Sequence, residues 1–284
     1  MSLKGPAGQM QPETGIGRDE GHRRSLLERR HDGDVLTLTM NSSATRNALS
    51  EAMMAALQGA LDEARHDKGL RAIIVAAEGP AFCAGHDLKE LSAHRSDDDG
   101  GRAFFASMMS QCAALMQTIV HSPKPVIAAI EAMATAAGCQ LVASCDLAVA
   151  GAAARFCTPG VNIGLFCSTP MVALTRNISR KRAMEMLLLG EVIDAAAAAD
   201  FGLVNHAVAA GGAMARARAM ADIIAAKSSA TVAIGKEAFY RQIEQPLADA
   251  YDYAADVMVR NMMHADAEEG IGAFIEKRKP QWCG

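Results

Sequence analysis

The sequence predicts an α/β fold followed by a helical C-terminal part, and three observations support this prediction. Short apolar segments alternate with helical segments from about residue 25 to about residue 210, as in proteins whose parallel strands are joined by crossing helices. From about residue 211 onward only helical patterns remain. The chain has 284 residues, of which 50% are hydrophobic, so it is long enough to bury a large core without disulfides or a metal.

The first expected elements are a hairpin and an amphipathic helix. The alternating segment 25–39 is interrupted by Asp32-Gly33, a pair typical of tight hairpin turns. Ser50 is a good N-cap for the helix that follows, whose apolar residues recur on one face. The elements expected after these are the strand 72–76, the loop 78–80, the loop 94–101, the helix 102–120, the strand 126–130, the helix 139–145, the strand 147–150, the helix 180–189 and the helix 194–202.

These patterns divide the chain into three parts. Residues 1–24 are rich in glycine, proline and charge and are expected to form a flexible segment, and residues 25–210 are expected to form the core. Residues 211–284 are expected to form a helical oligomerisation region. The apolar faces of these helices need a cover, which either the core or a neighbouring subunit supplies.

Composition argues against several classes of protein. The net charge of −4 gives no reason to expect nucleic acid as a partner, and no apolar run reaches the roughly 18 residues of a membrane span. The seven cysteines include no C-x-x-C pair and the histidines show no metal-ligand spacing, so we expect no metal and no separate cofactor. Most of the cysteines are interpreted as small buried hydrophobic residues in a reducing compartment, and a cytoplasmic location is expected.

Two segments rich in small residues are candidates for a ligand site. The first, Ala81-Phe-Cys-Ala-Gly-His-Asp-Leu-Lys-Glu90, follows a strand, and the second, Ala136-Ala-Gly-Cys-Gln140, begins a helix. Small residues let a ligand approach the backbone, and a helix start offers unpaired N–H groups. Two such N–H groups facing one point would form an oxyanion hole, although tight packing of turns also explains small residues.

The same two segments resemble the signatures of the enoyl-CoA hydratase/isomerase (crotonase) superfamily, the second over residues 134–146. The likeness continues in register through residues 183–190, 199–204 and 269–280. Residues 158–170 resemble the mitochondrial enoyl-CoA hydratase domain-containing members of this superfamily. The resemblance implies a crotonase (ClpP-like) spiral of ββα units, with a C-terminal helical region that joins subunits into a homotrimer or a dimer of trimers.

The resemblance also implies a site for an acyl-CoA thioester, with coenzyme A as part of the substrate. The backbone N–H groups of His86 and Ala137 would hold the thioester carbonyl and stabilise an enolate. Most relatives carry glycine where this chain has Ala137, but a methyl group does not remove the N–H. The residues assigned to substrate binding are Arg46, Ala84, Asp87, Leu88, Lys89, Phe274 and Lys277, of which Phe274 and Lys277 would reach coenzyme A from a neighbouring subunit.

Both catalytic glutamates of the family are absent from this sequence. In the family they hold one water and move its proton, and their positions align with Gln140 and Gly160. Glutamine holds a water but does not take its proton at neutral pH, and glycine has no side chain. Because general acid–base help is typically worth ~10²–10⁴ in rate, ordinary hydration is expected to be weak or absent.

Three hypotheses remain open from the sequence. In the first, a lyase, isomerase or hydrolase uses the oxyanion hole with another acid or base, such as His86. In the second, the chain is a non-catalytic acyl-CoA binder or regulator. In the third, a hydratase swings Asp87 or Glu90 inward as a replacement carboxylate, although a helix cap is the better explanation for Asp87.

Overall fold

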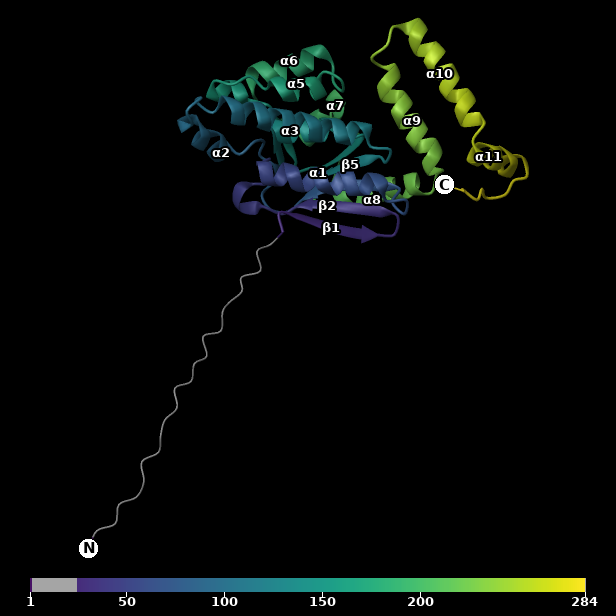
Figure 1. The fold of residues 1–284 in the computed structure, drawn as a ribbon, viewed down its shortest axis with the longest axis horizontal. Coiled ribbons are helices and arrows are strands. Elements are labelled where there is room, and N and C mark those ends of the chain that lie inside the picture. Colours follow the sequence, from purple (N-terminus) through teal and green to yellow (C-terminus); the bar gives the residue numbers. More distant parts are fainter. Residues whose placement is uncertain (2–24, 284) are drawn as a thin grey trace.

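The computed structural model describes residue 1 and residues 25–283, and most of the segment expected to be flexible, 1–24, lies outside the described residues (Figure 1). The larger of two sheets has six strands, parallel except for the edge strand at its N-terminal end. In their order across the sheet these strands are β1 (Leu27–Asp32), β2 (Val35–Met40), β3 (Ala72–Ala77), β5 (Val126–Ile130), β7 (Leu147–Gly151) and β10 (His206–Val208).

The smaller sheet is built from strands of two or three residues. Its strands, in order, are β4 (Ala81–Cys83), β6 (Met133–Thr135), β8 (Arg155–Cys157) and β9 (Ile193–Asp194). The chain passes from the larger sheet to the smaller one three times, from β3 to β4, from β5 to β6 and from β7 to β8. This repetition is the spiral of ββα units that the resemblance implies.

Helices cover both faces of the larger sheet. The helices of the described chain are α1 (Glu51–His66), α2 (Leu88–Ala93), α3 (Arg102–His121), α4 (Ala137–Ser144), α5 (Ser168–Leu174), α6 (Arg180–Leu189), α7 (Ala195–Phe201), α8 (Ala213–Ala225), α9 (Ser229–Gln242), α10 (Leu247–Met262) and α11 (Ala265–Ile275), with 3-10 turns at Ser43–Thr45, His94–Ser96 and Pro159–Ile163. Alternate residues of β3 point to opposite faces, so Ile73 joins the core under α1, α3 and α4, whereas Ile74 packs against α8.

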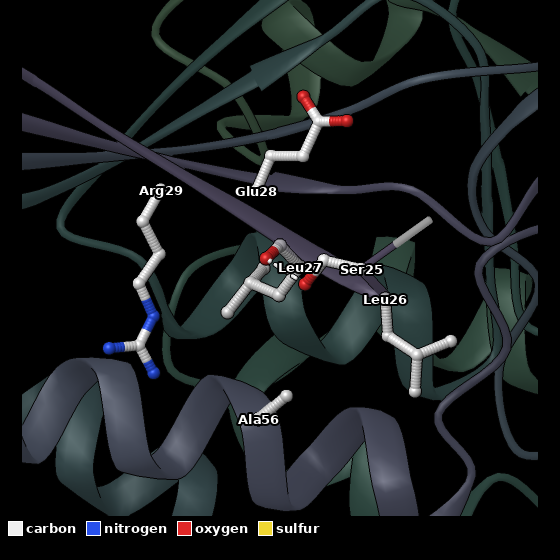
Figure 2. Close-up of a pocket in the computed structure, with 6 residues that line it drawn as sticks. All are labelled: Ser25, Leu26, Leu27, Glu28, Arg29 and Ala56. Carbon is white, nitrogen blue, oxygen red and sulfur yellow. Dashed lines mark hydrogen bonds between the residues drawn. The ribbon is translucent and has the colours of Figure 1, made fainter. Parts of the chain in front are cut away.

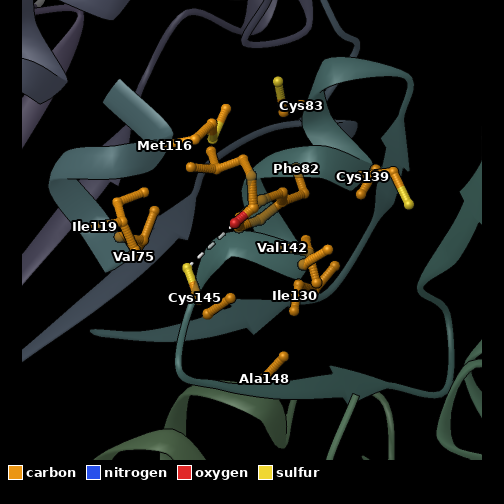
Figure 3. Close-up of a cluster of buried hydrophobic side chains, with 14 of the residues drawn as sticks. Val75, Phe82, Cys83, Met116, Ile119, Ile130, Cys139, Val142, Cys145 and Ala148 are labelled. Atoms are coloured by element: carbon orange, nitrogen blue, oxygen red, sulfur yellow. Dashed lines mark hydrogen bonds between the residues drawn. The ribbon is translucent and has the colours of Figure 1, made fainter. Parts of the chain in front are cut away.

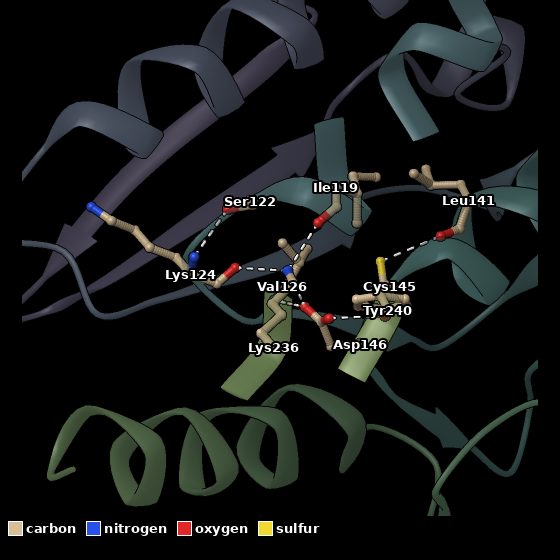
Figure 4. A network of polar contacts seen from close by, with 9 residues as sticks. All are labelled: Ile119, Ser122, Lys124, Val126, Leu141, Cys145, Asp146, Lys236 and Tyr240. Carbon is tan, nitrogen blue, oxygen red and sulfur yellow. Dashed lines mark hydrogen bonds and ion pairs between the residues drawn. The ribbon is translucent and has the colours of Figure 1, made fainter. Parts of the chain in front are cut away.

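The last three helices project from this body. Figure 1 shows α9, α10 and α11 at the end of the molecule opposite to α2. A buried ion pair anchors α9 to the core, since Lys236 Nζ lies 2.7 Å from Asp146 Oδ2 and the Tyr240 hydroxyl donates to Asp146 Oδ1 at 3.0 Å (Figure 4). Burial raises the pKa of Asp146 against the opposing effect of Lys236, and burial lowers the pKa of Lys236.

Most of the expected elements are found, with differences at the short ones. The hairpin forms, and the Ser50 hydroxyl accepts a hydrogen bond from Met53 N at 3.2 Å, as an N-cap should. The expected loop 94–101 begins with a 3-10 turn, and the sequence analysis did not predict α2, α5 or the smaller sheet. Helix α8 lies in the region expected to join subunits, yet it packs on the larger sheet of its own chain.

Among the described helices, α3 alone is long and apolar enough to cross a membrane, with a mean hydropathy of 1.3, and it packs against α1 and α4.

An open hollow borders β1 and α1, and Figure 2 shows the six residues that line it. These residues are Ser25, Leu26, Leu27, Glu28, Arg29 and Ala56. None of the predicted site residues lines this hollow.

Candidate active site

The segment between β2 and α1 pairs with the loop that follows β4. Leu49 N donates to the Gly85 carbonyl at 2.7 Å, and Ala84 N donates to the Arg46 carbonyl at 3.1 Å. Leu49 and His86 form an isolated parallel bridge. Because this bridge uses the Gly85 carbonyl, it leaves the N–H of His86 directed away from Leu49.

Asn47 holds this loop arrangement in place through hydrogen bonds, a role that was not predicted from the sequence. Its buried side-chain amide donates to the carbonyls of Glu78 and Ala81, both at 2.8 Å, and its Oδ1 accepts from Ser42 N at 2.7 Å. Its backbone is left-handed, with a φ of 54°, which asparagine tolerates better than most residues. An asparagine between a strand and a helix cap was the only signal available, because its partners lie far away in sequence.

The start of α4 lies directly against this loop. A Cβ at Gly85 would lie 3.0 Å from Ala136 Cβ and 3.4 Å from Ala137 N, so the two small-residue segments are in contact. Gly138 is required here because a Cβ would lie 2.2 Å from the Cys83 carbonyl oxygen. Ala136 has a φ of 52° and a ψ of −117°, a strained conformation for a residue with a side chain.

The backbone N–H groups of His86 and Ala137 are not bonded to the surrounding loops and are therefore available to bind a ligand. In the described part of the chain, neither donates to a carbonyl of these turns and loops. Ala137 is the first residue of α4, where an N–H has no partner within the helix and the helix dipole favours negative charge. Chemically, a pair of such donors stabilises an oxyanion.

The His86 imidazole is held in one orientation. Its Nδ1 lies 3.3 Å from the Leu49 carbonyl oxygen, and because a carbonyl only accepts, Nδ1 carries the proton. Nε2 is then an unprotonated acceptor, buried and without a hydrogen-bond partner among the described residues. Burial lowers the pKa of His86, opposed by the bond to Leu49, so the ring is neutral at neutral pH.

The nearby carboxylates are engaged elsewhere. Asp87 caps α2 and accepts hydrogen bonds from Lys89 N at 2.9 Å and Glu90 N at 3.3 Å. Glu90 Oε2 in turn accepts from Glu51 N, at the start of α1, at 3.2 Å. Both groups therefore stabilise helix starts, which counts against the hypothesis of a replacement carboxylate at Asp87 or Glu90.

The two positions aligned with the family's glutamates differ in kind. Gln140 is buried in α4, and its Oε1 lies 3.9 Å from the Cys112 thiol, within the range of a weak S–H hydrogen bond. Gly160 is enclosed by its own loop, since a Cβ would lie 2.8 Å from the Leu165 carbonyl oxygen and 2.9 Å from Cys167 Sγ. A side chain at residue 160 therefore requires the loop to move.

The cysteines of this region are neutral thiols. Burial raises the pKa of Cys83 to about 12 and that of Cys112 to about 11. Burial also raises the pKa of Cys139. Because the thiolate is the nucleophilic form, these neutral thiols are poorly suited to nucleophilic catalysis. They pack in the hydrophobic core, as the sequence predicts (Figure 3).

The residues assigned to coenzyme A fall into two groups. Ala84, Leu88 and Lys89 lie on the loop after β4 and the first turn of α2, next to the exposed Arg46. Phe274, which is 85% exposed, and Lys277 lie at the end of α11. Because α11 projects away from α2 (Figure 1), one chain does not bring the two groups together.

In this spiral of ββα units, the loops that follow β4 and β6 meet at the start of α4. This arrangement defines a protein of the crotonase class. The chain belongs to the enoyl-CoA hydratase/isomerase family, whose model matches residues 30–284. The mitochondrial enoyl-CoA hydratase domain-containing protein 3 of Mus musculus is 44% identical over 263 residues, which cover 93% of this chain and 86% of the mouse protein.

Solved structures agree with this assignment. The crystal structure of an enoyl-CoA hydratase from Mycobacterium smegmatis is 49% identical, with a TM-score of 0.86, and the match covers 91% of this chain and 99% of that one. The human enoyl Coenzyme A hydratase domain-containing protein 3 is 43% identical, with a TM-score of 0.86 and coverage of 91% and 100%. These matches confirm the predicted fold class and the family resemblance.

The comparisons correct one expectation. The relatives from mouse, human and rat are all named mitochondrial, so the expected cytoplasmic location is wrong. The physical reason for the error is that free cysteines indicate a reducing environment without distinguishing one compartment from another.

Proposed function

We propose that this chain binds an acyl-CoA thioester and stabilises its enolate between the backbone N–H groups of His86 and Ala137. The contact between the two small-residue segments supports this most directly, since a Cβ at Gly85 would lie 3.4 Å from Ala137 N. The strained Ala136 immediately before Ala137 supports it too, because such strain gathers at functional sites. Membership in a family that acts on acyl-CoA thioesters gives the substrate class.

Ordinary hydration of an enoyl thioester is not the main reaction in this proposal. Gln140 and Gly160 supply no carboxylate, and Asp87 and Glu90 already bind helix N–H groups. The group that remains is His86 Nε2, a buried and unprotonated acceptor next to the proposed oxyanion donor. We assign it the role of base for the proton on the carbon next to the thioester carbonyl.

Exchange of that proton tests the proposal. Butyryl-CoA incubated with the protein in D₂O should gain deuterium at the α-carbon, because His86 removes the proton and the oxyanion hole holds the enolate until a deuteron returns. The His86→Gln variant keeps the backbone N–H and should bind butyryl-CoA with unchanged affinity but lose about 10²-fold in exchange rate. The exposed His66→Gln is the matched control and should exchange like the wild type.

A second candidate function is that of a non-catalytic acyl-CoA binder or regulator. The carboxylates of Asp87 and Glu90 favour it, because both already accept hydrogen bonds from helix N–H groups and neither is left to move a proton. The same measurement separates the two functions. Binding of butyryl-CoA without deuterium gain, together with no crotonyl-CoA hydration, would establish the binder, and rapid crotonyl-CoA hydration would refute both proposals.

We also propose that the site is completed by a second copy of the chain in a trimer or a dimer of trimers. The exposed apolar side chains of the projecting helices support this assembly. These side chains include Phe239, Ile243, Leu247, Tyr251, Met258, Val259, Met262, Ile271, Phe274 and Ile275. In this arrangement Phe274 and Lys277 contact coenzyme A held by the neighbouring core.

A further inference from the structure

Residues 278–283 form a C-terminal strap that returns from the end of α11 to the junction of α8 and α9 (Figure 1). Within it, the indole N–H of Trp282 donates to the Ala226 carbonyl, at the end of α8, at 2.9 Å. The ring itself lies against α11, because a Cβ at Gly270 would lie 3.2 Å from Trp282 Cζ3 and 3.3 Å from Cη2. Trp282 therefore joins α11 to the end of α8.

Two carboxylates of α11 bind the backbone of the strap. Asp266 Oδ1 accepts a hydrogen bond from Cys283 N at 2.6 Å, and Glu269 Oε1 accepts one from Gln281 N at 2.7 Å. Asp266 is buried, and its Oδ2 accepts from the hydroxyl of Ser228, the N-cap of α9, at 2.5 Å. Hydrogen bonds to a carboxylate are among the stronger ones in proteins. The strap and the start of α9 thus hold α11 through one shared carboxylate.

The residues of α11 assigned to coenzyme A lie outside these contacts. Asp266 and Ala273 are buried against the same chain, whereas Phe274 is 85% exposed. Lys277 follows in the left-handed conformation that ends many helices, and Arg278 N donates to the Ala273 carbonyl at 3.0 Å across it. The strap therefore continues directly from Lys277 and determines where the exposed end of α11 lies.

We propose that Trp282 is a positioning residue for the coenzyme A end of the substrate, and that it acts through Phe274 and Lys277. This inference rests on the proposed function and assembly, which place these two residues on coenzyme A bound by the neighbouring core. Because the strap orders α11 before the ligand arrives, less conformational entropy is lost on binding. Trp282 does not contact the reacting atoms, so its loss should change affinity for coenzyme A thioesters and leave the chemical step unchanged.

Two glycines of α11 provide a matched pair of variants. Gly270→Ala places a methyl group against the Trp282 ring, whereas a Cβ at Gly272 would meet nothing within 4 Å. Both changes favour the helical backbone to a similar extent. Gly270→Ala should weaken butyryl-CoA binding about threefold, and Gly272→Ala should bind like the wild type. Trp282 is the only tryptophan of the chain, so a shift of its emission to longer wavelength in Gly270→Ala reports the displaced ring.

Variants of the tryptophan itself give a larger effect. Trp282→Ala should weaken butyryl-CoA binding about tenfold in calorimetry. Trp282→Phe keeps a ring against α11 without the N–H, and should weaken binding about threefold. In deuterium exchange of butyryl-CoA, Trp282→Ala should raise KM and leave kcat unchanged. S-butyryl-N-acetylcysteamine, a thioester without the nucleotide, should exchange with an unchanged kcat/KM. Size-exclusion chromatography and thermal unfolding check that each variant is assembled and folded.

The wild type provides a test that needs no variant. Because coupling between two sites is reciprocal, bound butyryl-CoA should slow amide hydrogen exchange in residues 278–283, measured by mass spectrometry. S-butyryl-N-acetylcysteamine should leave this exchange unchanged. The absence of any slowing by saturating butyryl-CoA would overturn the proposal, even if Trp282→Ala fails to fold.

The outcomes separate this inference from the proposed function. If folded Trp282→Ala binds butyryl-CoA like the wild type, or if it affects butyryl-CoA and the truncated thioester equally, the role of Trp282 is overturned. If the wild type binds butyryl-CoA without exchanging its α-proton, the calorimetric affinities alone decide. If the wild type binds no butyryl-CoA, the proposed function fails instead.

Discussion

At the scale of single residues, the buried imidazole of His86 couples stability to pH. Burial lowers its pKa below the ordinary value of 6.5, so the unfolded chain takes up a proton at a higher pH than the folded chain. The stability that His86 contributes is therefore complete above about pH 6.5 and is lost as the pH falls through the folded-state pKa. Between pH 7 and pH 5, the free energy of unfolding should fall more steeply for the wild type than for His86→Gln.

Urea unfolding of both proteins at several pH values measures this difference. His66→Gln, whose ring is exposed, should follow the wild type and serves as the control. Parallel curves for the wild type and His86→Gln would mean that His86 is not kept neutral by burial.

The strained Ala136 leads to a second prediction at this scale. Its φ of 52° and ψ of −117° cost a residue with a side chain about 1–3 kcal/mol, while glycine adopts them freely but is more flexible when unfolded. Ala136→Gly should therefore raise the free energy of unfolding by about 1 kcal/mol. Ala143→Gly, within α4, is the control and should lower it by about 0.5–1 kcal/mol or more, because its helical backbone is already relaxed.

Denaturant unfolding measures whether each of the two variants raises or lowers the free energy of unfolding. Butyryl-CoA binding by Ala136→Gly should be retained, since the N–H of Ala137 is unchanged. If Ala136→Gly lowers the free energy of unfolding instead, the packing of the methyl group contributes more stability than the strained backbone costs.

At the scale of elements, the loop between β2 and α1 supports the loop after β4, which carries His86. Two side-chain hydrogen bonds of Asn47, to the carbonyls of Glu78 and Ala81, tie the loop between β2 and α1 to the turn before β4 and to the start of β4, and a third bond, from Ser42 N, lies within the loop. Asn47→Ala leaves buried backbone groups without partners and should lower the free energy of unfolding by about 2–4 kcal/mol. Asn41→Ala removes an exposed side-chain bond to Glu28 and should change it by less than about 0.5 kcal/mol.

Asn47→Ala should also slow deuterium exchange of butyryl-CoA, because the backbone of His86 is no longer held in place. The exchange rate is compared at a temperature where thermal unfolding shows the variant to be folded. A folded variant that exchanges at the wild-type rate would show that Asn47 stabilises the fold without positioning the site.

The same elements show how far the sequence determines the structure. The hairpin, α1 and α3 were predicted because each carries enough residues for its period to be read. The strands of the smaller sheet have two or three residues, too few to display alternation, and so they were missed. Gln140 and Gly160 were singled out by alignment with the family. The closed loop around Gly160 was not predicted, because it depends on the tertiary path of residues 160–167.

At the scale of the whole molecule, the proposed site is divided between two chains. His86 lies in the core. Phe274 lies on the projecting α11, and Lys277 lies just after its end, at the other end of the same chain (Figure 1). Lys277 has a left-handed backbone, and the bidentate pair of Arg278 with Glu269, at 2.6 and 2.8 Å, follows directly after it. This pairing fixes the chain at the residue that would reach the neighbouring core.

Mixed oligomers test this division. His86→Gln lacks the base and the double variant Phe274→Ala/Lys277→Ala lacks the contacts to coenzyme A, so each alone should exchange the α-proton of butyryl-CoA poorly. When equal amounts of the two chains are co-expressed and purified without selection for mixed oligomers, random assembly gives about a quarter of the composite sites both an intact core and an intact α11. Exchange should then recover to about a quarter of the wild-type rate. Separately purified variants, combined without exchange of subunits, should show no recovery. Equal activity of the co-expressed and combined samples would mean that each site is built from a single chain.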